Sequence, residues 1–135
     1  MDFLATALYA GALNSPVGAL SLLFALVIGH AICDFPLQGQ FLATGKNRNV
    51  KMPDPEGDPF PGNLWAYCLS AHSLIHAGMV WLVTGSVIFG LIEFVCHWLI
   101  DFGKCEKWTN FAGDQALHIL CKVGFTVAIY FGVCA

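Results

Sequence analysis

Four long apolar runs constrain this chain of 135 residues more than any other feature of its sequence. Each run is about as long as an α-helix must be to cross the hydrocarbon core of a bilayer. Only 11% of the residues are charged, against about 25% in soluble domains, so too little polar surface remains to coat a soluble globule. The apolar runs cover residues 17–33, 64–83, 87–102 and 111–133.

These runs predict an all-α integral membrane protein, folded as an antiparallel bundle of four transmembrane helices in a single domain, residues 1–135. Ser15 and Pro16 are typical of a helix cap and a first helical turn. The shorter apolar run from Phe3 to Leu13 cannot span a bilayer, so we expect a short N-terminal helix in the membrane interface. The predicted helices cover about 16–37, 64–83, 87–103 and 112–133.

The connections between the helices predict how the bundle is oriented. Residues 38–62 form a polar loop, and the alternating prolines of its second half, 53–62, predict a stiff extended segment. Lysine and arginine gather in the first and third connections, which places these on the cytoplasmic side and both termini outside the cytoplasm. The residues that set this orientation are Lys46, Arg48, Lys51, Lys104 and Lys107.

The six cysteines form no CxxC pair, and five of them fall in apolar runs. In such surroundings cysteine behaves as a small hydrophobic residue, so we interpret them as packing residues rather than as disulfides or thiolate ligands. The net charge of −3 and the lack of a basic stripe argue against a nucleic-acid partner.

Ionisable side chains recur inside the predicted helices at a spacing of four residues, which places each set on one helix face. All five histidines of the chain take part. With a rise of about 1.5 Å per residue, His30, His97 and His118 lie about 9–10 Å from the cytoplasmic helix ends, and His72 lies about 12 Å in. The sets are His30 and Asp34; His72 and His76; Glu93, His97 and Asp101, with Lys104 beyond; and Asp114, His118 and Lys122.

A single buried histidine is often only a hydrogen-bonding core residue, and a carboxylate near a helix end can reach headgroup water. A whole set is harder to explain in this way, because each ionisable residue inside a membrane costs about 2.5–3.5 kcal/mol to insert. Histidine nitrogen with carboxylate oxygen is the ligand mixture of zinc, manganese and iron sites. The candidate ligands are His30, Asp34, His72, His76, His97, Asp101, Asp114 and His118.

This set suits a divalent metal ion, with zinc or manganese favoured. Eight candidates exceed the needs of one tetrahedral ion, so the set fits either two ions or one ion with outer carboxylates. Haem is the weaker alternative, because its axial histidines give the aspartates no role.

Glu93 and Lys122 lie deeper than the histidines, about 15 Å from the cytoplasmic boundary on consecutive antiparallel helices. An isolated charge at that depth needs an opposite partner, so we predict that the two residues pair and orient His97 or His118. Two alternatives stay open: Glu93 is itself a ligand or the general base, or Lys122 extends along apolar surface towards an interface.

The motifs resemble a known family when taken in order. The string HAICDFPLQ from His30 to Gln38 precedes His72-x3-His76, then His97-x3-Asp101-x2-Lys104, then Asp114-Gln115-x2-His118. This order resembles a family of small bacterial and phage membrane proteins described as domain of unknown function 3307, which is in turn similar to predicted membrane-bound metal-dependent hydrolases. The resemblance implies a metal site and a bacterial inner (cytoplasmic) membrane location. The proline-rich segment of the first connection does not match that pattern.

Together these observations predict a metal-dependent hydrolase that acts at the cytoplasmic leaflet on a lipid-linked or phosphate ester. Asp34, Asp101 or Asp114 would supply the general base, and Lys104, with Lys46 or Arg48, would receive a phosphate.

Two other functions stay open: a non-catalytic membrane subunit with a structural metal site, and a proton or metal-ion transporter. A transport path should continue across the membrane, whereas the outer halves of the first two helices are apolar. Membrane lipid is the expected partner, and homo-oligomers are compatible with the sequence.

Overall fold

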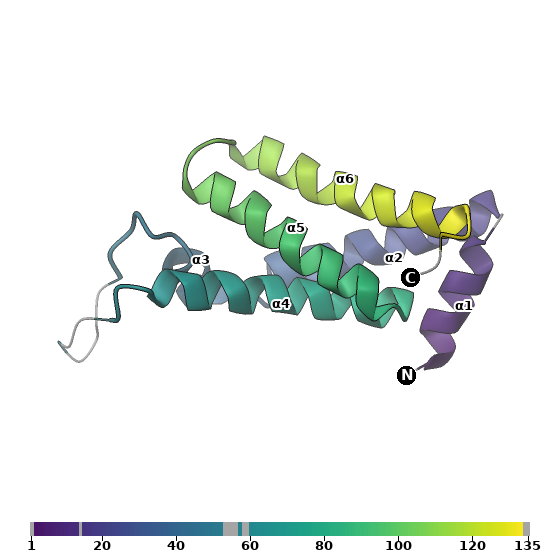
Figure 1. Ribbon diagram of the computed structural model, residues 1–135, viewed down its shortest axis with the longest axis horizontal. Coiled ribbons are helices and arrows are strands. Elements are labelled where there is room, and N and C mark those ends of the chain that lie inside the picture. Colours follow the sequence, from purple (N-terminus) through teal and green to yellow (C-terminus); the bar gives the residue numbers. More distant parts are fainter. Residues whose placement is uncertain (1, 14, 53–56, 58–59, 134–135) are drawn as a thin grey trace.

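A computed structural model shows an all-α fold for the residues that it describes, 2–13, 15–52, 57 and 60–133. Within these ranges there are six helices and no strand. Four long helices lie side by side as an antiparallel bundle (Figure 1). The helices are α1 (Asp2–Ala12), α2 (Pro16–Asp34), α3 (Gly39–Gly45), α4 (Leu64–Thr84), α5 (Val87–Cys105) and α6 (Phe111–Tyr130).

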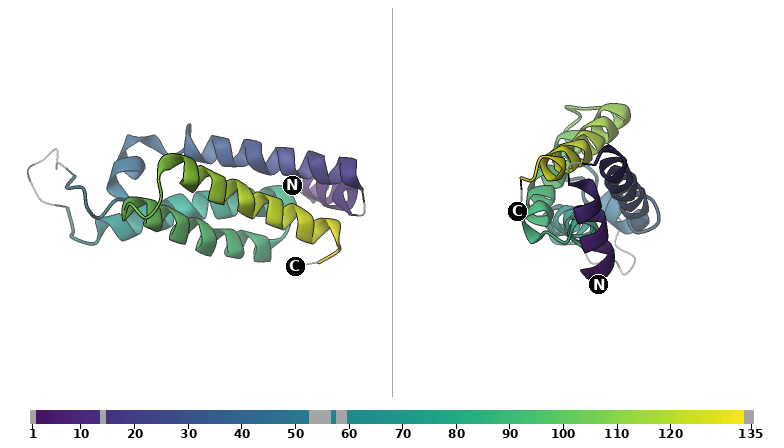
Figure 2. Two further views of the ribbon diagram at one scale, coloured as in Figure 1. Left: turned by 90° about the horizontal axis from the view of Figure 1, so that it is seen from above. Right: turned by 90° about the vertical axis from the view of Figure 1, so that its right-hand side faces the viewer.

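The two short helices lie at opposite ends of this bundle. Helix α3 and the long connection that follows it lie at one end, and α1 crosses the other end, where α6 finishes (Figures 1 and 2). The crossing of α1 over α2 is very close, because a Cβ on Gly18 would stand 1.6 Å from the carbonyl oxygen of Gly11. Only glycine at this position lets the two backbones meet.

Local capping explains where the long helices begin and end. The side chains of Ser15, Ser86 and Asn110 accept hydrogen bonds from backbone N–H groups of the first turns of α2, α5 and α6. Helix α4 ends at Thr84 and is capped by Gly85, whose φ of +74° suits a residue without a Cβ. Since Ser86 caps the next helix at once, α4 and α5 form a tight antiparallel hairpin.

The first long helix ends three residues earlier than the predicted position 37. Helix α2 stops at Asp34, and Pro36, which has no backbone N–H to continue the helical hydrogen bonds, follows two residues later. Helix α3 was not expected at all, since residues 38–62 were predicted to be a polar loop. The extended segment expected over 53–62 falls mostly outside the described residues, as does Cys134. The other five cysteines are free thiols.

The apolar core lies in the half of the bundle nearer to α1. Leu22 and Leu26 of α2 meet Val80 of α4 and Phe125 and Ile129 of α6 there, all of them buried. The polar candidates occupy the other half, so the bundle has an apolar half and a polar half.

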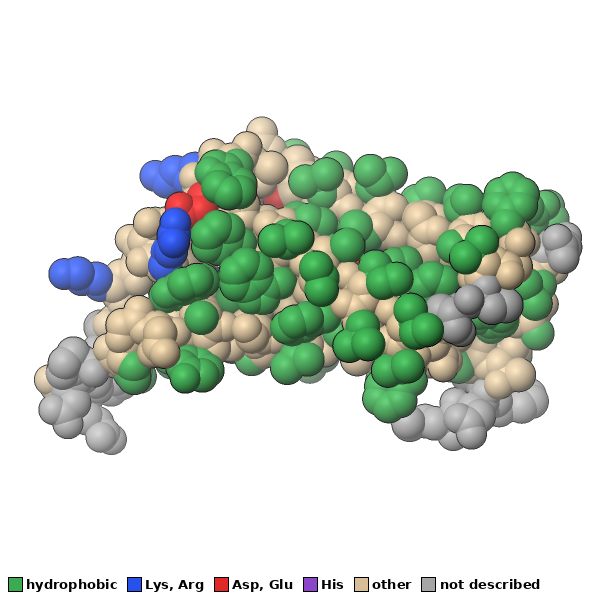
Figure 3. Space-filling model, viewed as in Figure 1, with side chains coloured by type: hydrophobic (Ala, Val, Ile, Leu, Met, Phe, Trp, Pro, Cys, Tyr) green, Lys and Arg blue, Asp and Glu red, His purple; other side chains and the backbone are tan. Residues whose placement is uncertain are grey.

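Two of the described helices, α2 with 19 residues and α4 with 21, are long and apolar enough to cross a membrane. Four such helices were predicted. Helices α5 and α6 carry more charged side chains, and all of these except Lys104 are buried. Their outer faces expose residues such as Leu91, Leu99 and Leu120. On the face drawn in Figure 3, apolar side chains spread along the whole bundle and the charged ones gather at one end.

Candidate metal centre

The eight predicted ligands come together inside the polar half of the bundle. Each of the four long helices contributes two of them. The five histidines are each at most 4% exposed, and Asp101 and Asp114 at most 2%. The side chain of Asp34 is 12% exposed, which makes it the most accessible of the eight. Six of the eight belong to groups whose ligand atoms lie close enough together to share an ion, whereas His30 and Asp114 do not.

Four ligand atoms form the first group that could hold an ion: one each from Asp34, His72, His76 and His97, all within 4.8 Å of one another. Oδ1 of Asp34 lies 3.1 Å from Nε2 of His76 and 3.4 Å from Nε2 of His72. A tetrahedral ion with bonds of about 2.0–2.1 Å separates its ligands by about 3.3 Å. These separations therefore suit three-histidine, one-carboxylate coordination.

A second group shares one residue with the first. His97, Asp101 and His118 also offer atoms within 4.8 Å of one another. Nε2 of His118 lies 3.6 Å from Oδ1 of Asp101, and Nε2 of His97 lies 3.7 Å from Oδ2 of the same carboxylate. The two groups therefore adjoin at His97.

His30 and Asp114 belong to neither group, although both touch the cluster. Nδ1 of His30 lies 3.4 Å from Nδ1 of His76, and its Nε2 lies 3.4 Å from Oε1 of Gln115. Asp114 lies 3.6 Å from Nε2 of His118 through one oxygen. Both residues stand where they can orient ligands rather than complete either group.

The predicted pair of Glu93 and Lys122 is confirmed. Nζ of Lys122 donates to Oε1 of Glu93 at 2.5 Å, and both side chains are 1% exposed. The same carboxylate oxygen lies 3.2 Å from Nδ1 of His97. When this nitrogen carries the proton, Nε2 of His97 is left bare and faces the ligand groups, as metal-binding histidines require.

Two further lysines pair with carboxylates of the cluster. Nζ of Lys46 donates to Oδ2 of Asp101 at 2.6 Å, and Nζ of Lys104 donates to Oδ2 of Asp114 at 2.8 Å. Lys46 is 6% exposed, whereas the side chain of Lys104 is 29% exposed. Lys104 thus stands at the accessible edge of the centre.

Two glutamines also reach the cluster. Gln115 donates to Oδ2 of Asp34 at 2.8 Å, and the amide of Gln38 lies 3.2 Å from Nε2 of His72. Neither was predicted as a site residue, because a single glutamine at a helix end carries no pattern. The only signal was that both stand inside the motif strings.

Several buried polar atoms of the cluster have no hydrogen-bond partner among the described residues. They include Nε2 of His97, Nδ1 of His72 and both ring nitrogens of His118. A buried polar atom without a partner costs about 1–3 kcal/mol, so native proteins rarely keep several together. An ion bound by these nitrogens would remove that cost.

The segment from Lys46 to Asn49 is fastened to the end of α5. Arg48 donates to both carboxylate oxygens of Glu106, at 2.7 and 2.9 Å, and its guanidinium lies 4.9 Å from the ring centre of Phe102. The hydrogen bonds from Arg48 hold the pKa of Glu106 below its usual range. Asn49 donates to the Cys105 carbonyl oxygen.

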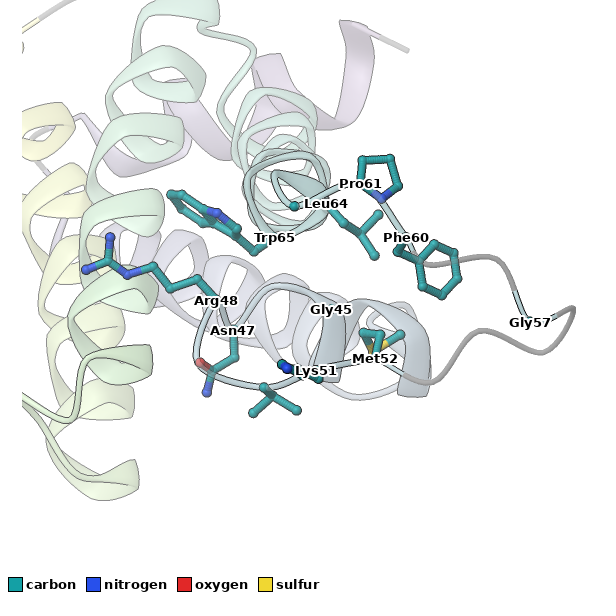
Figure 4. Close-up of a pocket in the computed structure, with 12 residues that line it drawn as sticks. Gly45, Asn47, Arg48, Lys51, Met52, Gly57, Phe60, Pro61, Leu64 and Trp65 are labelled. Atoms are coloured by element: carbon teal, nitrogen blue, oxygen red, sulfur yellow. The ribbon is translucent and has the colours of Figure 1, made fainter.

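A cavity of about 570 Å³ opens beside this segment, and the residues that line it fall between positions 45 and 65 of the sequence. Figure 4 shows Arg48 extending from it towards α5, with Trp65 on the same side. None of the eight ligand candidates lines the cavity, so it is separate from the metal centre.

The fold and the centre together define a helical-bundle protein with a buried histidine and carboxylate cluster that could hold a metal ion. The chain belongs to the family described as "Protein of unknown function (DUF3307)", whose model matches residues 22–132. No curated protein and no solved structure matches the chain. The resemblance drawn from the four motifs is therefore confirmed at the level of this family.

Proposed function

We propose that this protein is a membrane-embedded, metal-dependent hydrolase that acts on a lipid-linked or other phosphate ester. One observation carries the proposal: four helices direct their histidines and aspartates into one buried cluster, and several of the histidine nitrogens have no partner among the described residues. Such nitrogens suit a divalent ion, zinc or manganese from the donor set.

A divalent ion held there would supply Lewis acidity. By expanding to a fifth position it would also acidify a water bound there to a pKa of about 7. The first group would hold it through Asp34, His72, His76 and His97. Glu93 would fix the ring of His97 so that Nε2 faces the ion.

Residues at the edge of the centre would supply the general base and the cation that binds the phosphate. Asp114 lies outside both ligand groups and adjoins His118, so we assign it as the general base. Lys104 is the partly exposed cation beside it and suits the charge of a phosphate. Gln115 positions the Asp34 carboxylate from the same edge.

The distribution of side chains supports a bundle in which all four long helices cross the membrane. Each carries large apolar residues that are at least 40% exposed, among them Phe24, Leu74, Val95 and Leu120. The charges inside α5 and α6, apart from Lys104, are buried among other polar groups, as ionisable residues in membranes are. By the distribution of lysine and arginine, the polar half lies at the cytoplasmic leaflet of a bacterial inner membrane.

One alternative has an observation in its favour. The histidines are nearly sealed from solvent, and structural metal sites are closed whereas catalytic sites keep an open position. A non-catalytic subunit held together by the ion is therefore the second candidate. A transporter is less supported, since Leu22, Leu26 and Phe125 fill the other half of the bundle with apolar side chains.

Hydrolysis by the purified protein separates the two candidates. The protein in detergent is loaded with zinc or manganese and assayed on nitrophenyl phosphates and on a polyprenyl phosphate. Metal-dependent phosphate release that His97→Ala abolishes supports the hydrolase. The matched control is Trp98→Phe, because Trp98 adjoins His97 but donates to Ser70. A metal-loaded protein that releases no phosphate from any of these esters refutes the hydrolase.

A further inference from the structure

We propose that this centre binds one divalent ion rather than two, and that Lys46 occupies the position of the second cation. The inference rests on the proposed metal site and concerns its stoichiometry. His97 belongs to both ligand groups. Nδ1 of His97 faces Glu93, so Nε2 alone is available, and one nitrogen binds one ion. Filling the first group thus leaves the second short of a ligand.

The balance of charge in the centre also indicates a single ion. Three of the four carboxylates of the cluster each pair with one lysine: Asp101 with Lys46, Asp114 with Lys104, and Glu93 with Lys122. Asp34 has no lysine and instead lies within 3.4 Å of His30, His72 and His76. The cluster therefore keeps one uncompensated negative charge, on the carboxylate of the first ligand group. One divalent ion there leaves a small net charge, whereas a second would add uncompensated positive charge in a buried site.

Lys46 is a fixed part of the centre rather than a surface lysine that happens to reach it. Its ammonium is buried and lies 2.6 Å from Oδ2 of Asp101, the carboxylate that a second ion would need. The backbone carbonyl of Lys46 accepts from the thiol of Cys105.

The arrangement gives helix α3 and the segment after it a role in the centre. Gly45, which ends α3, packs where a Cβ would stand 2.8 Å from Sγ of Cys68, and Arg48 is fastened to Glu106. Lys46 lies between these two anchor points, so its position is set from both sides. Because Oδ2 of Asp101 lies 3.4 Å from Nε2 of His72, Lys46 would stand beside an ion that His72 holds. An oxyanion bound to the ion would have a second cation next to it.

Metal stoichiometry of the purified full-length protein tests the inference. Protein in detergent is equilibrated with excess Mn²⁺, passed through a desalting column, and its metal content measured. We expect one ion per chain in the wild type. We expect Lys46→Met to bind a second ion through Asp101 and His118, with water in place of the shared His97, because the substitution frees Asp101. Lys46→Met/Asp101→Asn should return to one. The control Lys51→Met removes an exposed lysine of the same connection and should stay at one.

Electron paramagnetic resonance of the bound Mn²⁺ shows whether two ions are adjacent, and this does not depend on the total metal content of the sample. An isolated ion gives a six-line signal, and two adjacent ions couple and change it. Two coupled ions in the wild type, or a single ion in a folded Lys46→Met, overturns the role of Lys46. Should Lys46→Met fail to fold, the wild-type count and signal decide alone. A folded wild type that binds no ion refutes the metal site itself and with it the proposed function.

Discussion

The buried pair of Glu93 and Lys122 gives the sharpest prediction about stability. Each side chain is 1% exposed, and they meet at 2.5 Å. Removing either partner leaves the other as an unpaired buried charge, which costs about 3–5 kcal/mol. We therefore expect Glu93→Gln and Lys122→Met each to lower the free energy of unfolding by about that amount. The double variant leaves no orphaned charge, so its loss should fall at least about 2 kcal/mol short of the sum.

The assay is reversible unfolding in mixed micelles, followed by helical circular dichroism. Thr126→Val is the matched control: its hydroxyl donates only to the Lys122 carbonyl one turn away, so its loss should be about 1 kcal/mol or less. Because Glu93 also holds His97, Glu93→Gln should weaken metal binding by about 10–100-fold. Losses that add within about 0.5 kcal/mol would refute the pairing.

Three further predictions concern the rest of the fold. Gly18→Leu should displace α1 from α2 and destabilise the protein by about 1–3 kcal/mol or more. The control Gly124→Ala, where a Cβ meets nothing within 4 Å, should be neutral or stabilising by up to about 1 kcal/mol. Equal melting temperatures for the two variants would contradict the close crossing. The lowered pKa of Glu106 means that its contact with Arg48 is present above the ordinary carboxyl pKa and is lost as the pH falls through the lowered value. Hydrogen exchange of the backbone amides of residues 46–49 should therefore stay slow in the wild type from neutral pH down to about pH 4. In Arg48→Gln the same amides should exchange fast at neutral pH. Equal exchange rates in the two proteins would contradict the contact. Reporter fusions should place both termini outside the cytoplasm, and a cytoplasmic C-terminus would reverse the orientation.

The sequence predicts the long helices because apolar length and caps are local signals. Helices α4 and α5 begin and end within two residues of the expected positions, since Thr84, Gly85 and Ser86 mark their junction without ambiguity. Helix α3 is different: it has seven residues with a glycine at each end, and isolated helices that short are unstable. Its contacts with α4 hold it in place, and sequence spacing does not encode them.

The candidate centre, like the helices, is predicted only where local sequence patterns determine it. The spacing of four residues predicts which side chains share a face, and the depth of each predicts that they meet. Which of them form one ligand group depends on side-chain rotamers and helix rotation, so the separation of His30 and Asp114 from the two groups could not be foreseen. The pairing of Lys46 with Asp101 depends on the fold of the connection after α3, which has no periodic pattern.

X-ray absorption at the metal edge tests the central claim most directly. The protein is purified without chelators, loaded with zinc, and its spectrum compared with that of Asp34→Asn. Binding by Asp34, His72, His76 and His97 predicts about three nitrogens and one oxygen at about 2.0–2.1 Å, with imidazole scattering that persists while the oxygen contribution weakens in the variant. A spectrum dominated by sulfur at about 2.3 Å, or zinc that washes away from the folded wild type, would contradict the account.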